Sequence, residues 1–107
     1  MTMPLVLAAL DTTVQELRIE QHQRAFIQTL AHIVTALGAI PDAPGDFTTD
    51  DMARLVELAG ETIEAIERRI DSSGDGEDVQ QRLAGTVYEV GRRMETIDAW
   101  FRRRESA

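Results

Sequence analysis

The sequence predicts an all-α protein, specifically an up-down-up antiparallel three-helix bundle that associates as a helical dimer. Long segments without proline carry apolar residues at spacings of 3 and 4, and no stretch alternates with period two as a strand would. Residues 38–46, with two Pro and two Gly, and the polar residues 71–76 separate these segments. We expect a single domain over residues 1–107 with helices at about 12–37, 49–71 and 77–104, and residues 1–11 as a short helix or an extended arm.

The middle segment, residues 49–71, has the clearest helix start. Thr48 is placed to cap the helix, and Asp51 follows three residues later, as in a capping box. Phe47 precedes the cap, where it can pack against Met52. The apolar residues that follow form one helical face. This predicted core face consists of Met52, Val56, Ala59, Ile63, Ile66 and Ile70.

The last segment, residues 77–104, repeats the pattern over a longer stretch. Its acidic start and its arginines at 102–104 both complement the helix dipole. Gly85 and Gly91 each cost about 1 kcal/mol relative to alanine inside a helix. They indicate either the close approach of another backbone or no packing role at all. The predicted core face consists of Val79, Leu83, Val87, Val90, Met94, Ile97 and Phe101.

The first segment carries two apolar faces. One set contains Leu10, Val14 and Leu17, and the other begins at Ile19 and runs to Leu37. On one continuous helix the two sets would lie about half a turn apart. Either the chain breaks, or one helix presents two faces to different partners. Residues 13–16 read as a capping box, which favours a helix start near residue 12.

Composition excludes several chemistries. The 107 residues include 19 acids and 11 basic residues, all of them Arg, for a net charge of −8, and there is no Cys. The chain therefore has no disulfide, no thiol nucleophile and no lysine for Schiff-base chemistry. A chain with this net negative charge is poorly suited to bind the phosphate backbone of a nucleic acid, because like charges repel. We therefore expect no direct nucleic-acid binding. No catalytic or cofactor-binding motif occurs, so we expect no catalytic residue and no cofactor.

The sequence also indicates a location. The apolar run at residues 5–10 lacks the preceding positive charge and the length of a signal peptide, and it is too short to span a bilayer. We expect a cytoplasmic protein without a membrane association. The use of arginine in place of lysine is typical of a GC-rich bacterial or phage genome.

Several apolar residues lie off the predicted core faces. An isolated three-helix bundle would not bury them, so they predict self-association. Tyr88 lies between Ala84 and Gly91 and is a candidate interface centre, because aromatic anchors dominate binding energy. A half-covered surface tyrosine is the alternative. The interface candidates are Leu10, Val14, Leu17, Leu58, Ala84, Tyr88 and Trp100.

Two acidic pairs suggest a possible metal site. Glu61-Thr62-Ile63-Glu64 and Glu95-Thr96-Ile97-Asp98 resemble the E-x-x-E and E-x-x-D motifs of all-α nucleoside-triphosphate pyrophosphatases, which hold Mg²⁺ between neighbouring helices. Helical geometry turns Glu61 about 180° and Glu64 about 120° from the core face of their segment. Within one bundle the four carboxylates therefore do not converge, and such a site would need a dimer.

The loop after the middle segment is also expected to hold no metal. The first half of an EF-hand loop is matched by Asp71, Ser73, Asp75 and Gly76. Position 12 of such a loop should supply a bidentate Glu, but here it is Arg82. The two histidines, His22 and His32, are ten residues apart and cannot share a metal on one helix.

The charge is concentrated rather than uniform. Residues 42–78 hold twelve acids and three Arg, whereas residues 92–107 hold five Arg and three acids. In size and charge the chain resembles phage-encoded inhibitors such as anti-CRISPR proteins, which occupy nucleic-acid sites on their targets. The sequence therefore allows three functions: a non-enzymatic helical adaptor or regulator that self-associates and binds another protein, an acidic inhibitor, or a Mg²⁺-dependent nucleotide hydrolase. We favour the first.

Overall fold

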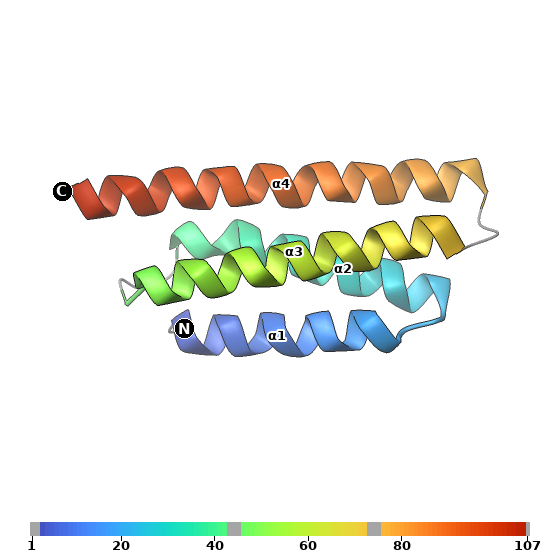
Figure 1. Ribbon diagram of the computed structural model, residues 1–107, viewed down its shortest axis with the longest axis horizontal. Coiled ribbons are helices and arrows are strands. Elements are labelled where there is room, and N and C mark those ends of the chain that lie inside the picture. Colours follow the sequence, from blue (N-terminus) through green and yellow to red (C-terminus); the bar gives the residue numbers. More distant parts are fainter. Residues whose placement is uncertain (1–2, 43–45, 73–75, 107) are drawn as a thin grey trace.

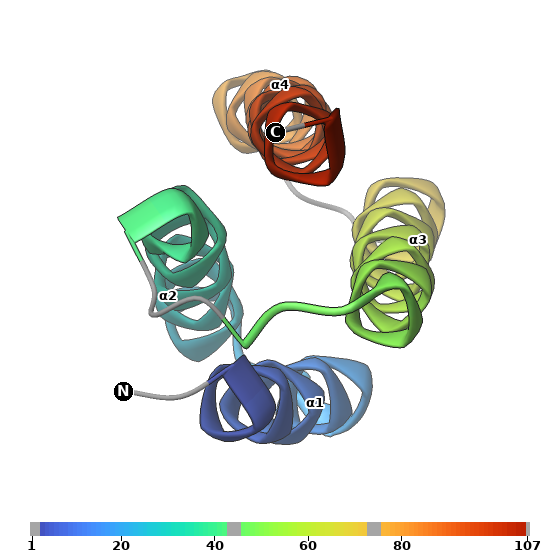
Figure 2. The ribbon, with the colours of Figure 1, turned by 90° about the vertical axis from the view of Figure 1, so that its left-hand side faces the viewer.

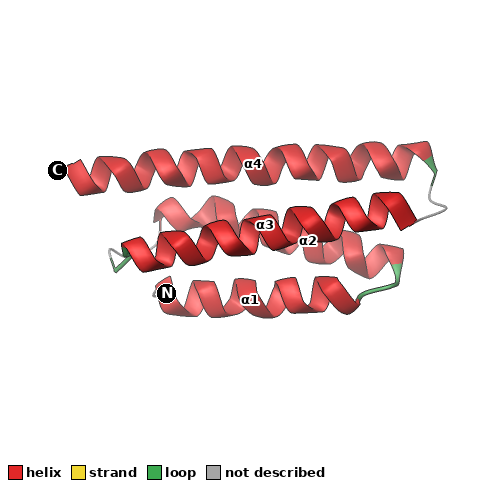
Figure 3. Ribbon diagram, in the orientation of Figure 1, coloured by secondary structure: helices red, strands yellow, loops and turns green. Residues whose placement is uncertain are grey.

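The computed structural model describes residues 3–42, 46–72 and 76–106, and these fold into four long helices (Figure 1, Figure 3). Helix α1 spans Met3–Ile19 and α2 spans Gln23–Ala39, followed by the 3-10 turn η1 at Ile40–Asp42. Helix α3 spans Thr49–Ser72 and α4 spans Glu77–Ser106. The described residues contain no strand, so the all-α class predicted from the sequence is confirmed.

The four helices lie along the long axis of a body of 49 × 21 × 18 Å. Viewed from one end, α1, α2, α4 and α3 follow one another around the bundle, so that α1 and α4 occupy opposite corners (Figure 2). The chain reverses direction at each connection (Figure 1). The neighbours α1 and α3 are therefore parallel, as are α2 and α4, whereas α1–α2 and α3–α4 are antiparallel hairpins. The expected three-helix bundle is wrong.

The error lies in the first segment, where a single helix over residues 12–37 was expected. Helix α1 already begins at Met3 and runs without interruption through residue 12, and the chain breaks at residues 20–22. The hydroxyl of Thr13 donates to the carbonyl of Ala9 at 2.7 Å instead of capping a helix start. At the actual break, the carboxylate of Glu20 accepts the backbone N–H of His22 at 2.6 Å. The two apolar faces thus belong to two different helices.

Parallel packing of α1 on α3 is marked by three polar contacts at a constant offset of 43 residues. The backbone N–H of Met3 donates to the carboxylate of Asp46 at 3.1 Å. About two and four helical turns further along, Asp11 pairs with Arg54 at 2.6 Å, and Arg18 pairs with Glu61 at 3.0 Å. The last two contacts lie seven residues apart on both helices, so a single register satisfies both. Partly exposed pairs contribute only about 0.2–1 kcal/mol each, and their main effect is to fix this register.

The start of α3 agrees with the sequence. The backbone N–H of Thr48 donates to the Asp51 carboxylate at 2.9 Å, and the Thr48 hydroxyl accepts the backbone N–H of Asp51 at 3.2 Å. This reciprocal capping box satisfies two donors that a helix start would leave without partners. The ring of Phe47 is buried edge-on against Trp100 and Phe101, with ring centroids 5.4 and 5.0 Å away. The cluster anchors the connection before α3 to the C-terminal half of α4.

The core is continuous and draws on all four helices. The face expected for α4 is correct, because Leu83, Val90 and Ile97 are buried and the remaining members pack against them. The face expected for α3 is rotated, since Val56 is 55% exposed whereas Leu55 and Leu58 are buried. Ile19, expected in the core of the first helix, is 79% exposed at the end of α1. Helix α3 contacts both α1 and α4, so its buried face is wider than the single predicted stripe.

Gly60 provides a test of the exposed side of α3. A Cβ built at this position meets nothing within 4 Å, and the residue lies in the middle of the helix. We expect Gly60→Ala to raise the free energy of unfolding by about 1 kcal/mol, because alanine has the higher helix propensity and no contact opposes it. Urea unfolding followed by circular dichroism measures the change. A lower stability for this variant would show that another group approaches α3 at this point.

Candidate functional site

The structure divides the seven interface candidates into two groups. Leu10, Val14, Leu17 and Leu58 are at most 2% exposed and lie in the core, which corrects the expectation that a bundle would leave them uncovered. The reason is that α1 is a full helix and fills the side of the bundle that three helices would leave open.

The other three candidates remain at the surface of α4. Trp100 is half-buried, with its ring against Phe47 and the guanidinium of Arg104 at 4.9 Å from its centroid. Ala84 is exposed, and Tyr88 is 70% exposed. Ala84 and Tyr88 are therefore the only members of the predicted set that lie open to contact by another molecule.

Sequence reasoning missed the outer face of α2, although its signal is present. No charged residue occurs between Arg24 and Asp42, in a chain that carries 28% charged residues. By length and composition, the segment Gln23–Asp42 is apolar enough to cross a bilayer, yet only 28% of its most apolar window is buried in the bundle. The apolar spacing predicted only a core helix here. The exposed positions between Arg24 and Asp42 are uncharged: Gln28, Ala31, His32, Thr35 and Ala39.

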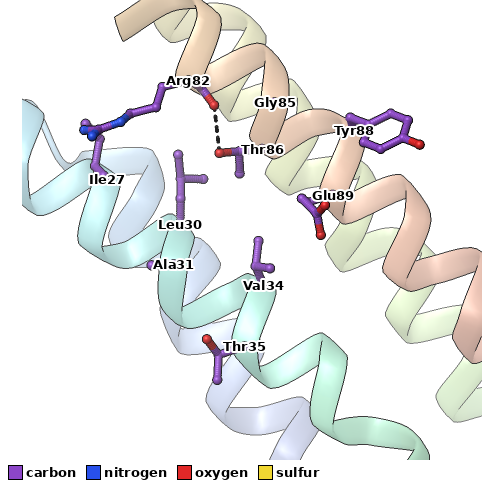
Figure 4. Close-up of a pocket in the computed structure, with 10 residues that line it drawn as sticks. All are labelled: Ile27, Leu30, Ala31, Val34, Thr35, Arg82, Gly85, Thr86, Tyr88 and Glu89. Carbon is purple, nitrogen blue, oxygen red and sulfur yellow. Dashed lines mark hydrogen bonds between the residues drawn. The ribbon is translucent and has the colours of Figure 1, made fainter.

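A shallow groove runs between the parallel helices α2 and α4, with a volume of about 680 Å³ (Figure 4). Leu30 and Val34 form its floor, and Ala31 and Thr35 its α2 side. On α4 the groove is bordered by Arg82, Gly85, Thr86 and Glu89, and the ring of Tyr88 points away from the other lining side chains. The Thr86 hydroxyl donates to the carbonyl of Arg82 at 3.0 Å, so this polar group is already satisfied within the helix. The groove therefore offers mainly apolar and small side chains to a neighbour.

Two glycines widen the accessible surface of α4. A Cβ built at Gly85 or at Gly91 meets nothing within 4 Å, so no contact inside the described chain requires glycine at either position. The close approach that these glycines indicated does not occur within the chain. Together with Ala84 they leave the α4 backbone open on either side of Tyr88.

The two acidic pairs are not brought together. Glu61 pairs with Arg18 of α1, Glu64 lies 4.0 Å from Arg68, and Asp98 pairs with Arg102 at 3.1 Å. Among the described residues, no group of three or more His, Asp or Glu side chains is placed to hold a metal ion. Glu61, Glu64 and Asp98 thus act as partners of arginines, whereas Glu95 is exposed on α4.

The remaining polar positions define no further centre. His22 is exposed just before α2, and His32 is exposed on its outer side. Residues 73–75, which complete the loop considered as a calcium site, lie outside the described residues. The acids of α3 fall largely on its outer side, where Asp50, Glu57, Glu64 and Asp71 are exposed at intervals of seven residues.

The fold and this surface define a small, acidic four-helix protein with a largely apolar groove between α2 and α4, bordered by Arg82 and Glu89. Comparison with protein-family models, with curated proteins and with solved structures finds no match to this chain.

Proposed function

We propose that the protein is a non-enzymatic helical interaction module that forms a two-fold symmetric homodimer through its α2–α4 face. The observation that carries the proposal is the outer face of α2 beyond Arg24, which has no charged side chain and lies beside a largely apolar groove. Depletion of charged side chains is typical of the centre of a protein interface. We identify the occupant as a second copy of the chain because the charges along α4 are self-complementary.

A two-fold axis requires that residue i of one copy contacts residue j of the other and that j contacts i. An antiparallel arrangement of two α4 helices, centred between Val90 and Gly91, places Asp78 opposite Arg103 and Glu89 opposite Arg92. Asp78, Arg92 and Arg103 are exposed, and Glu89 is half-exposed on the groove. This single register therefore forms four ion pairs in the dimer. Two join Asp78 of one copy to Arg103 of the other, and two join Glu89 to Arg92.

The same register suits the steric properties of α4. These charged residues lie on the side of α4 that turns toward the groove, about 130° from the centre of its buried face. A second α4 placed there lies in the groove, next to Ala31 and Thr35. Gly85 meets the small side chain of Thr96 of the other copy in this arrangement. Small residues on both sides allow helix axes to approach to about 8–10 Å.

Charge reversal tests this register directly. We expect Glu89→Arg alone or Arg92→Glu alone to weaken the dimer, because each places like charges opposite one another across the axis. The double variant exchanges the two charges and should restore association. Sedimentation velocity over a range of protein concentrations measures the effect.

A matched pair of residues outside the proposed interface serves as the control. Glu64→Arg and Arg68→Glu reverse an i,i+4 ion pair of 4.0 Å on the exposed side of α3, and these changes should leave the dimer intact. Failure of the double variant to associate, when both single variants are monomeric, would contradict the register. A wild-type protein that stays monomeric at millimolar concentration would contradict the dimer itself.

A further inference from the structure

A second groove lies at the end of the bundle where α2 begins and α3 ends, with a volume of about 720 Å³. Three helices each contribute one arginine to it: Arg24 from α2, Arg69 from α3 and Arg82 from α4. Its other lining residues are three glutamines, His22 and Ile27. None of the described residues that line this groove is acidic, although the chain has 19 acids and only 11 arginines.

Two of these arginines are available to a ligand. Among the described residues, neither Arg24 nor Arg82 forms an ion pair, whereas Arg18, Arg54 and Arg93 each pair with an acid of their own or a neighbouring helix. Both Arg24 and Arg82 are exposed. Guanidinium groups that share a groove without an acid repel one another, so an anion bound between them is favoured.

The third arginine is held in position. The Nη1 of Arg69 donates to the backbone carbonyl of Gln21 at 3.0 Å, and its guanidinium lies 5.1 Å from the ring centroid of Phe26. An arginine already ordered by such contacts loses less conformational freedom when a ligand binds. Glu20, the acid nearest to Arg24 in sequence, accepts the N–H of His22 at 2.6 Å within the turn, and it is not among the residues that line the groove.

We propose that this groove binds a small soluble anion that carries two or more phosphate groups. The planar fork of a guanidinium matches the oxygen atoms of phosphate, and such charge-assisted pairs are among the strongest polar contacts in proteins. The glutamine amides supply further neutral donors. A volume of this size is typical of small-molecule sites, which occupy about 300–1,000 Å³. Arg82 and Ile27 also line the α2–α4 groove, so the test below changes Arg24, which lines this groove and not the α2–α4 groove.

Isothermal titration of the full chain with inorganic pyrophosphate, without divalent cations, tests the site. We expect saturable binding by the wild-type protein, and binding about tenfold weaker in Arg24→Gln, which lacks one charged donor. Arg102→Gln is the matched control, because it removes one charge from an exposed arginine that is paired with Asp98 on another part of α4. This variant should bind pyrophosphate as the wild type does.

Two results would overturn the proposal. One is the absence of binding by the folded wild-type protein at millimolar pyrophosphate. The other is an equal loss of affinity in Arg102→Gln and in Arg24→Gln, which would indicate a general effect of charge. Arg24→Gln replaces an exposed side chain outside the α2–α4 groove, and its circular dichroism and sedimentation should match those of the wild type. A loss of pyrophosphate binding is therefore distinguishable from a loss of the dimer.

Discussion

Replacing Leu17 by alanine is expected to lower the free energy of unfolding by about 2–5 kcal/mol. The Leu17 side chain is 1% exposed in the core, and its truncation removes apolar contacts and leaves a cavity. Domains of this size are stable by only about 5–15 kcal/mol, so the loss is a large part of the total. Urea unfolding followed by circular dichroism measures it.

The control for this variant lies two residues further along the same helix. Ile19 is 79% exposed, and Ile19→Ala should change the stability by no more than about 0.5 kcal/mol. The Leu17 effect should be the same at protein concentrations tenfold apart, because Leu17 is covered by its own chain. An effect that disappears at high concentration would instead place Leu17 in a contact between chains, as the sequence alone had suggested.

Replacing Gly85 by arginine is expected to abolish the proposed dimer without unfolding the chain. The position is exposed, and a Cβ there meets nothing within 4 Å, so the folded monomer accommodates the side chain. Arginine also has a higher helix propensity than glycine, by about 0.8 kcal/mol. In the dimer the same side chain would lie between two closely packed α4 helices. Overpacking costs about 1–3 kcal/mol of association free energy at each of the two symmetric contacts. The dissociation constant of the dimer should therefore rise by about tenfold or far more.

Gly60→Arg is the matched control for this variant. Gly60 is also an exposed helical glycine with open space at its Cβ, but it lies on α3, away from the α2–α4 face. Size-exclusion chromatography with light scattering should report a dimer for Gly60→Arg and a monomer for Gly85→Arg. Dimers of equal strength in both variants would mean that α4 does not form the interface.

The sequence predicted those features that depend on local interactions. The capping box at Thr48 and Asp51 involves residues three apart, and the structure forms it as expected. The core face of α4 follows from its spacing alone, because the helix is long and presents one continuous stripe to its neighbours. The starts and ends of α3 and α4 fall within two residues of the expected ranges.

The features that were missed depend on tertiary contacts. No Pro or Gly marks the break at residues 20–22, and the capping pattern at residues 13–16 is a false signal, because the Thr13 hydroxyl bonds back to Ala9. The only local indication was the change of apolar phase between Leu17 and Phe26. The sequence did not predict α1 as a full helix, so the side of α3 that α1 covers was expected to be exposed. For this reason Leu58 was expected outside the core and Val56 inside it, whereas the structure shows the reverse.

The candidate site was only partly visible in the sequence. Tyr88 and Ala84 were identified from their helical phase, and the structure leaves both exposed. The α2 side of the groove was not identified, because a long stretch without charged residues is also typical of a helix that is buried on all sides. The three arginines of the second groove are 45 and 13 residues apart along the chain, and only the arrangement of α2, α3 and α4 brings them to one groove.

The order of the helices around the bundle has a consequence for folding. Each antiparallel pair, α1 with α2 and α3 with α4, is joined by a short connection, so each hairpin closes a small loop and loses little chain entropy in doing so. The contacts of α1 with α3 and of α2 with α4 span many more residues and unite the two halves. The chain is thus built from two local units whose docking completes the core. Proteins rich in such local contacts reach the native state in microseconds to milliseconds.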